Sequence, residues 1–120
     1  MKKLVKTFCF DIDNIICSTD GLNYQKSKPY KQIINMINKL YCDGHEIKIF
    51  TARYMGRNNE NIIKANKQGY KKTFNQLKKW KLKFHKLFLC KPTFDVYVDD
   101  KAFGLKKNWY KLFRKKYPVC

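Results

Sequence analysis

Short apolar segments alternate with longer amphipathic segments along the 120-residue chain, and this alternation limits the fold more than any other feature. The short segments have the length and composition of buried strands, and they cover 6–10, 46–50, 85–89 and 95–98. Helical spacing follows Pro29, returns in a stretch that ends near Trp80 with Gly69 as a candidate break, and recurs through Leu112. Strands that alternate with helices form parallel sheets with helices on both faces. The sequence therefore predicts one α/β domain over residues 1–120, a Rossmann-like three-layer sandwich around a central parallel sheet.

Polar residues stand where each expected strand ends. In chain order these residues are Asp11 and Asp13, then Thr51, then Lys91, and finally Asp99 and Asp100. In open α/β sheets, ligands bind at the carboxyl ends of the strands. We therefore expect these residues to form a single site.

The carboxylates carry information because they are scarce. The chain has 9 acidic and 27 basic residues, yet four of the acids fall in the tight pairs Asp11/Asp13 and Asp99/Asp100. Like charges this close repel each other unless a cation or a shared proton compensates. The two pairs therefore predict a cation site or acid–base chemistry.

The expected site has the groups that phosphoryl transfer needs. One carboxylate of the first pair can attack phosphorus while the other handles the proton of the leaving group. Asp99 and Asp100 offer the hard oxygen ligands that suit Mg²⁺, and Lys91 offers a fixed ammonium. Thr51 adds a hydroxyl and a backbone amide for the equatorial oxygens.

Four short segments, FDID, IFTAR, KP and YVDD, resemble in this order the four motifs of the haloacid dehalogenase (HAD) superfamily. The resemblance spans the chain to about Phe103 and implies an HAD-like phosphatase that requires Mg²⁺. Asp11 would be the nucleophile that forms an aspartyl phosphate, and Asp13 the general acid and then base. The remaining roles implied are phosphoryl binding by Thr51, Ala52 and Lys91, and metal binding by Asp11, Asp13, Asp99 and Asp100.

Longer segments, among them KPYKQIINMINKLYCDGHEIKIFTARYMGR, resemble small HAD proteins associated with bacterial capsular polysaccharide synthesis. That resemblance implies a sugar phosphate or a similar small phosphorylated metabolite as the substrate. The family usually continues its first motif with Gly-Thr, whereas this chain has Asn14 and Ile15. Asn tolerates a positive φ angle better than most residues, so the turn can survive, but Ile15 supplies no hydroxyl.

The spacing of the motifs predicts an enzyme without a cap domain. Asp13 and Thr51 are separated by 37 residues, and Thr51 and Lys91 by 39. Each interval is filled by one helix, one strand and a connecting segment, and a cap with its own core would need more chain. We expect an open mouth that only the segment 14–28, the loop 54–61 or a neighbouring subunit of a homo-oligomer could cover. Arg53 and Arg57 flank this mouth and either hold a second anionic group of the substrate or face solvent.

The composition leaves two other function classes open. The formal charge is +18, which would attract nucleic acid and makes a phosphatase for nucleic-acid ends the main alternative. Only 3 of the 27 basic residues are Arg and the Lys residues are dispersed, so we favour a solvated surface. The departure at Asn14 and Ile15 leaves a weakly active or non-catalytic phosphate-binding homologue as the other alternative.

The chain has the features of a cytoplasmic protein. No apolar segment approaches the length of a membrane span, and Lys6 and Asp11 interrupt any signal-like run. The five cysteines are odd in number and lack CxxC spacing, so we expect reduced and mostly buried thiols rather than a disulfide framework or a zinc site.

Overall fold

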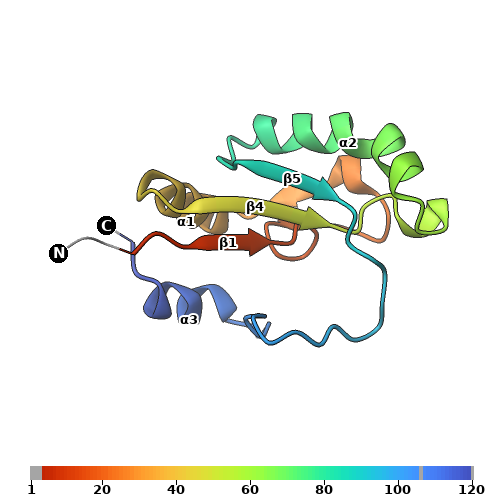
Figure 1. Ribbon diagram of the computed structural model, residues 1–120. Helices are drawn as coiled ribbons and strands as arrows, with labels where there is room; N and C mark the ends of the chain where they lie inside the picture. Colours follow the sequence, from red (N-terminus) through yellow and green to blue (C-terminus); the bar gives the residue numbers. More distant parts are fainter. Residues whose placement is uncertain (1–3, 106, 120) are drawn as a thin grey trace.

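The computed structural model describes residues 4–105 and 107–119, which form a three-stranded parallel sheet with three α-helices (Figure 1). The sheet has the strand order β1-β4-β5. Its strands are β1 (Thr7–Phe10), β4 (Glu46–Thr51) and β5 (Lys86–Leu89). The helices are α1 (Lys31–Cys42), α2 (Ile62–Lys79) and α3 (Trp109–Lys116).

The three strands bury one face of the sheet and leave the other more accessible. In the parallel register, Phe8 lies beside Ile47, and Ile49 lies beside Leu87. These residues are buried, whereas the alternate positions Cys9 and Lys86 are exposed. Helix α1 packs against β4 and α2 packs against β5. The apolar core therefore lies between the buried face of the sheet and these two helices.

Helix α3 closes the edge of the sheet at β1. In Figure 1 it lies beside β1, on the side away from β4. The Phe113 ring lies 5.6 Å from the ring of Phe8 and 5.7 Å from that of Phe10. The predicted parallel sheet with helices is thus present. A second helical layer over the Cys9 and Lys86 face is absent from the described residues, so the three-layer sandwich stays a prediction.

Most expected elements are confirmed within one or two residues, but α2 is not broken at Gly69. The helix runs unbroken through Gly69, and the glycine serves packing instead, because a Cβ atom there would overlap Cδ2 of the Tyr54 ring. At the other expected helix, Pro29 belongs to the short strand β3 (Lys28–Pro29) and α1 begins at Lys31.

The predicted strand at 95–98 is wrong. Residues 91–105 contain no helix or strand, and the side of β1 away from β4 pairs with no described strand. Val96 and Val98 are 77% and 91% exposed. A strand is held by burying one face and by pairing its backbone, and the segment 95–98 does neither in this structure.

The segment 14–28 is more ordered than a plain loop. It contains β2 (Cys17–Ser18), which pairs with β3 in antiparallel fashion, and the 3₁₀ helix η1 (Tyr24–Lys26). Asn14 has a φ of 64°, so the expectation that asparagine accepts the left-handed turn after the first motif is confirmed. We refer to residues 14–29 as the flap.

Two expectations from composition have mixed outcomes. Cys9, Cys17, Cys42 and Cys90 are free thiols, but only Cys17 is buried, so the expectation of mostly buried thiols is wrong; Cys120 lies outside the described residues. Within residues 4–105 and 107–119, no helix combines the length and hydropathy needed to cross a membrane.

Candidate active site

Asp11 and Lys91 meet at the carboxyl ends of β1 and β5. The Lys91 Nζ atom donates a hydrogen bond to Asp11 Oδ2 at 3.0 Å, across 80 positions of sequence. The other carboxylate oxygen, Oδ1, accepts the backbone N–H of Ile12 at 2.7 Å. The Asp11 side chain is 33% exposed and that of Lys91 only 14%. The pair therefore sits at the surface of a hollow, with the ammonium largely shielded and the carboxylate accessible.

Aromatic rings surround the Lys91 ammonium. Its Nζ lies 6.0 Å from the centre of the Phe50 ring and 5.4 Å from the centres of both the Phe94 and the Tyr97 rings. Cations within about 6 Å of an aromatic face are attracted by the ring quadrupole. These rings hold the ammonium next to Asp11.

Thr51 ends β4 between these two strands and is buried. Its Oγ1 accepts the backbone N–H of Arg53 at 3.1 Å, and its carbonyl oxygen accepts the backbone N–H of Lys91 at 3.2 Å. The hydroxyl hydrogen of Thr51 is left available for an acceptor in the adjoining groove, which Ala52 also lines.

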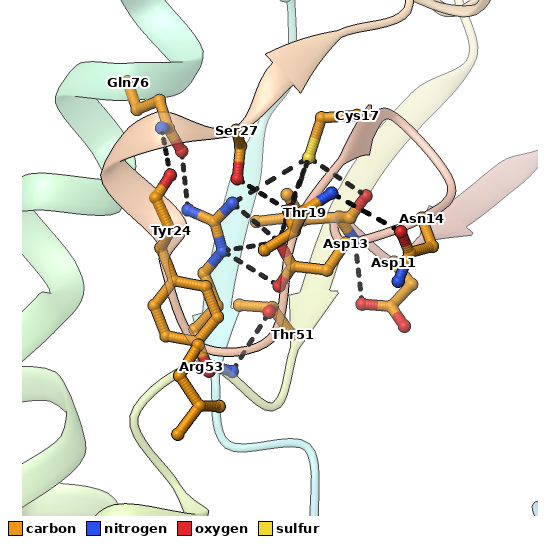
Figure 2. A network of polar contacts seen from close by, with 12 residues as sticks. Asp11, Asp13, Asn14, Cys17, Thr19, Tyr24, Ser27, Thr51, Arg53 and Gln76 are labelled. Atoms are coloured by element: carbon orange, nitrogen blue, oxygen red, sulfur yellow. Dashed lines mark hydrogen bonds and ion pairs between the residues drawn. The ribbon is translucent and has the colours of Figure 1, made fainter.

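The Asp13 carboxylate bonds to different partners from those of Asp11. Figure 2 shows this carboxylate directed toward Arg53. Arg53 Nε lies 3.2 and 3.0 Å from the two carboxylate oxygens, and Arg53 Nη2 lies 2.8 Å from Oδ1. Thr19 Oγ1 donates to the same Oδ1 at 2.6 Å. The Arg53 side chain is 0% exposed, so this is a buried ion pair rather than an arginine facing the mouth.

The Asp13–Arg53 pair extends into α2 and the flap (Figure 2). Arg53 Nη1 donates to Gln76 Oε1 at 2.6 Å, and Gln76 Nε2 donates to the carbonyl oxygen of Tyr24 at 2.7 Å. The Arg53 guanidinium also lies 4.8 Å from the centre of the Tyr24 ring. One guanidinium thus links β4, the flap and α2.

Sequence reasoning missed the partners of Arg53. Gln76 carried the clearest signal, because it is a long polar residue on the buried side of α2, next to Leu77. Thr19 and Tyr24 gave no comparable signal, since a hydroxyl or a ring in a flap has many uses.

Cys17 lies beside the same network. Its Sγ is 3.4 Å from Thr19 Oγ1 and 3.8 Å from Asp13 Oδ1. Burial raises the pKa of the Cys17 thiol, with the nearby Asp13 charge acting in the same direction. Cys17 is therefore a neutral thiol at pH 7 that packs against the pair.

Asp99 and Asp100 lie on the exposed segment that follows Pro92, and neither follows a strand directly. Asp99 accepts hydrogen bonds from the backbone N–H of Lys101 at 2.7 Å and the Tyr97 hydroxyl at 3.0 Å. These bonds, the Lys101 one first, hold the pKa of Asp99 below its ordinary value. Within the part of the chain that the structure describes, no three His, Cys, Asp or Glu side chains are placed to hold a metal ion.

Asp11 lines two hollows. The first has a volume of about 300 Å³ and is also lined by Lys91 and Asp99, but not by Asp100. The second is a groove of about 520 Å³ that is also lined by Asp13, Thr51 and Arg57. The structure therefore gathers Asp11, Asp13, Thr51, Lys91 and Asp99 around two adjoining hollows, although the Asp13 carboxylate is directed at Arg53.

The fold has a counterpart among solved structures. The chain is similar to the crystal structure of a structural-genomics target from Vibrio cholerae, with a TM-score of 0.76 and 23% sequence identity. The similarity covers 93% of this chain and 99% of that chain. No protein-family profile matches the chain, and no curated protein matches it either. The likeness therefore concerns the fold alone.

Proposed function

We propose that the protein is a capless HAD-type phosphatase that hydrolyses a small phosphate monoester, such as a sugar phosphate, through an aspartyl-phosphate intermediate. The observation that carries the proposal is the contact between Lys91 Nζ and Asp11 Oδ2 at 3.0 Å. It unites an accessible carboxylate with a shielded ammonium at the carboxyl ends of parallel strands. A structural ion pair is the simpler explanation, and the order of the four motifs favours the catalytic one.

In the proposed reaction an oxygen of Asp11 attacks phosphorus and forms the O–P bond of an aspartyl phosphate. The bond between phosphorus and the ester oxygen breaks, and the leaving oxygen takes a proton from Asp13, which must enter this step protonated and outside its ion pair with Arg53. Water then attacks phosphorus and gives a proton to Asp13. This attack breaks the bond between Asp11 and phosphorus, releases phosphate and regenerates the Asp11 carboxylate. Lys91 neutralises charge on the phosphoryl oxygens, and the Thr51 hydroxyl donates a hydrogen bond to one of them.

The position of Asp13 adds a requirement to this reaction. Its carboxylate bonds to Arg53 and Thr19, so it reaches a leaving group only by turning away from at least part of that network. A side-chain rotation is fast compared with typical turnover. Arg53 is therefore a positioning residue in this proposal, and it does not contact the substrate.

The proposed dependence on Mg²⁺ rests on the resemblance and on the hard oxygens of the acidic residues. In the described arrangement Asp11, Asp13 and Asp99 are directed at different partners, so a bound ion would require these side chains to turn toward a common point. No step above is therefore assigned to the metal.

A second candidate function is a phosphatase for nucleic-acid ends, which the formal charge of +18 favours. Binding through many lysines would weaken steeply with salt. A phosphate ester on an oligonucleotide end would then outcompete sugar phosphates at low salt and lose that advantage at high salt.

The nucleophile can be tested with p-nitrophenyl phosphate. Asp11→Asn should lower kcat by at least ~10³-fold, because an amide cannot form the aspartyl phosphate. Asp95→Asn removes an exposed carboxylate of the segment after β5 and is the matched control, with activity near that of the unaltered protein. Mass spectrometry of acid-quenched protein should find the phosphoryl group on the peptide that contains Asp11. Near-normal activity in purified Asp11→Asn would refute the proposal.

A further inference from the structure

Two arginines, four positions apart, follow β4 and have different surroundings. Arg53 is 0% exposed and its N–H groups are directed at Asp13, Gln76 and Cys17. Arg57 lies in the 3₁₀ helix η2 (Gly56–Asn58) and is exposed. Of these two arginines, only Arg57 has an exposed side chain, although Arg53 also lines the groove described above.

The Arg57 guanidinium lies over two aromatic rings. Its Cζ atom lies 4.7 Å from the centre of the Tyr54 ring and 5.4 Å from that of the Tyr24 ring. Its one described hydrogen bond goes from Nη2 to the carbonyl oxygen of Leu22, at a long 3.4 Å. A guanidinium has five N–H donors that lie in its plane, so ring contacts restrain it while leaving most donors available.

Arg57 lines the groove that Asp11, Asp13 and Thr51 also line. That groove has a volume of about 520 Å³, within the range of pockets that take small metabolites. A ligand whose phosphoryl group lies at Asp11 would extend along the groove toward the flap. Planar, paired donors match the two oxygens of a carboxylate or a phosphate.

We propose that Arg57 is the binding site for a second anionic group of the substrate, a carboxylate or a phosphoryl, which makes the preferred substrate a small phosphate ester with a further acidic group. This inference rests on the proposed phosphatase function. It assigns the selectivity to Arg57 alone and excludes Arg53.

The test compares two phosphate esters at a time, of which one carries a second acidic group and the other does not. The carboxylate pair is 3-phosphoglycerate and glycerol 3-phosphate, and the phosphoryl pair is fructose 1,6-bisphosphate and fructose 6-phosphate. For each pair, the kcat/KM of the ester with the second acidic group is divided by that of the ester without it. This ratio is measured for the unaltered protein, for Arg57→Met and for Arg114→Met. Arg114 is an exposed arginine of α3, so Arg114→Met removes the same charge away from the groove.

We expect Arg57→Met to reduce the ratio of at least one pair by about 10–100-fold, mainly through KM, as for a lost hydrogen bond to a charged group. The pair that responds identifies the second group, and Arg114→Met should leave both ratios unchanged. An equal loss of kcat/KM for the esters with and without the second acidic group in both pairs would overturn the inference, and so would no loss. So would an equal change in Arg114→Met, or an Arg57-dependent preference for a 3′-phosphorylated oligonucleotide over every small ester.

Failure of the underlying function gives a different result. If the unaltered protein hydrolyses neither p-nitrophenyl phosphate nor any ester, the phosphatase proposal fails. Calorimetric titration of Asp11→Asn protein with 3-phosphoglycerate and fructose 1,6-bisphosphate then tests Arg57 alone. If adding Arg57→Met to this variant weakens the binding of either ester by about 10-fold or more, the anion site is supported. If binding does not weaken, the anion site is overturned.

Discussion

Replacing Arg53 with methionine tests whether the buried Asp13–Arg53 pair holds the flap on the sheet. Methionine retains most of the apolar stem but removes every guanidinium hydrogen bond. Asp13 would keep the bond from Thr19 and lose those from Arg53, and Gln76 Oε1 would lose its donor at 2.6 Å. The substitution thus leaves a partly exposed carboxylate without its cation and a buried amide oxygen without its donor.

The expected cost follows from burial. Breaking a buried ion pair by removing one partner costs about 3–5 kcal/mol. The Asp13 side chain is 22% exposed and recovers some hydration, so we take the lower end, about 3 kcal/mol. A 120-residue chain has an unfolding entropy of roughly 0.25 kcal/mol/K, so Tm should fall by about 12 °C.

Urea unfolding followed by circular dichroism measures this cost, with the m value checked for constancy. The control is Arg57→Met, which makes the same change at an exposed arginine and should cost less than about 1 kcal/mol. In a double-mutant cycle with Asp13→Asn, the combined loss should fall short of the sum of the single losses by about 1.5 kcal/mol or more. An Arg53→Met protein as stable as Arg57→Met would refute the reasoning.

Three further outcomes are expected. Gly69→Ala should destabilise by about 1–2 kcal/mol in urea unfolding, although alanine favours helix, because the new methyl group meets the Tyr54 ring; a stabilised protein would contradict this packing. The Thr93 hydroxyl and backbone N–H hold the pKa of Glu60 below its ordinary 4.5, so the stability that this contact adds is complete above pH 4.5 and is lost as the pH falls through the lowered pKa. The stability difference between the unaltered protein and Glu60→Gln should therefore shrink below pH 4.5, and a difference that grows there would count against it. Phosphatase activity should disappear in excess EDTA and return with Mg²⁺, and full activity in EDTA would exclude the metal requirement.

Much of the fold follows from the sequence because local patterns determine it. The three strands of the sheet are marked by short apolar segments, and their polar ends place Asp11 and Lys91 at one edge without further information. Helices α1 and α2 follow from apolar spacing. Gly69 shows the limit of this reasoning, since a glycine inside a helix looks like a break until the ring that packs against it is known.

The remaining features depend on contacts between distant segments. The sequence 95–98 has strand composition, yet composition does not decide whether a segment pairs with a sheet edge or buries one face, and this segment does neither. Arg53 presents the same difficulty, because an arginine is expected at the protein surface when only the sequence is known. Its burial depends on Asp13, Gln76 and Tyr24, which three separate segments supply.

The strained loop between β4 and α2 supports the proposed role of Arg57 in ligand binding. Tyr54, Asn59 and Glu60 have φ angles of 68°, 52° and 62°, a left-handed conformation that costs a non-glycine residue about 1 kcal/mol or more. The Asn58 amide compensates by donating to the Tyr54 carbonyl oxygen at 2.7 Å, and Glu60 compensates by accepting the Thr93 backbone N–H at 2.8 Å. These bonds fix the turn that places the Tyr54 ring under the Arg57 guanidinium. Strained residues are retained where their geometry serves a site, and here the strained turn presents an arginine to the groove that Asp11 lines.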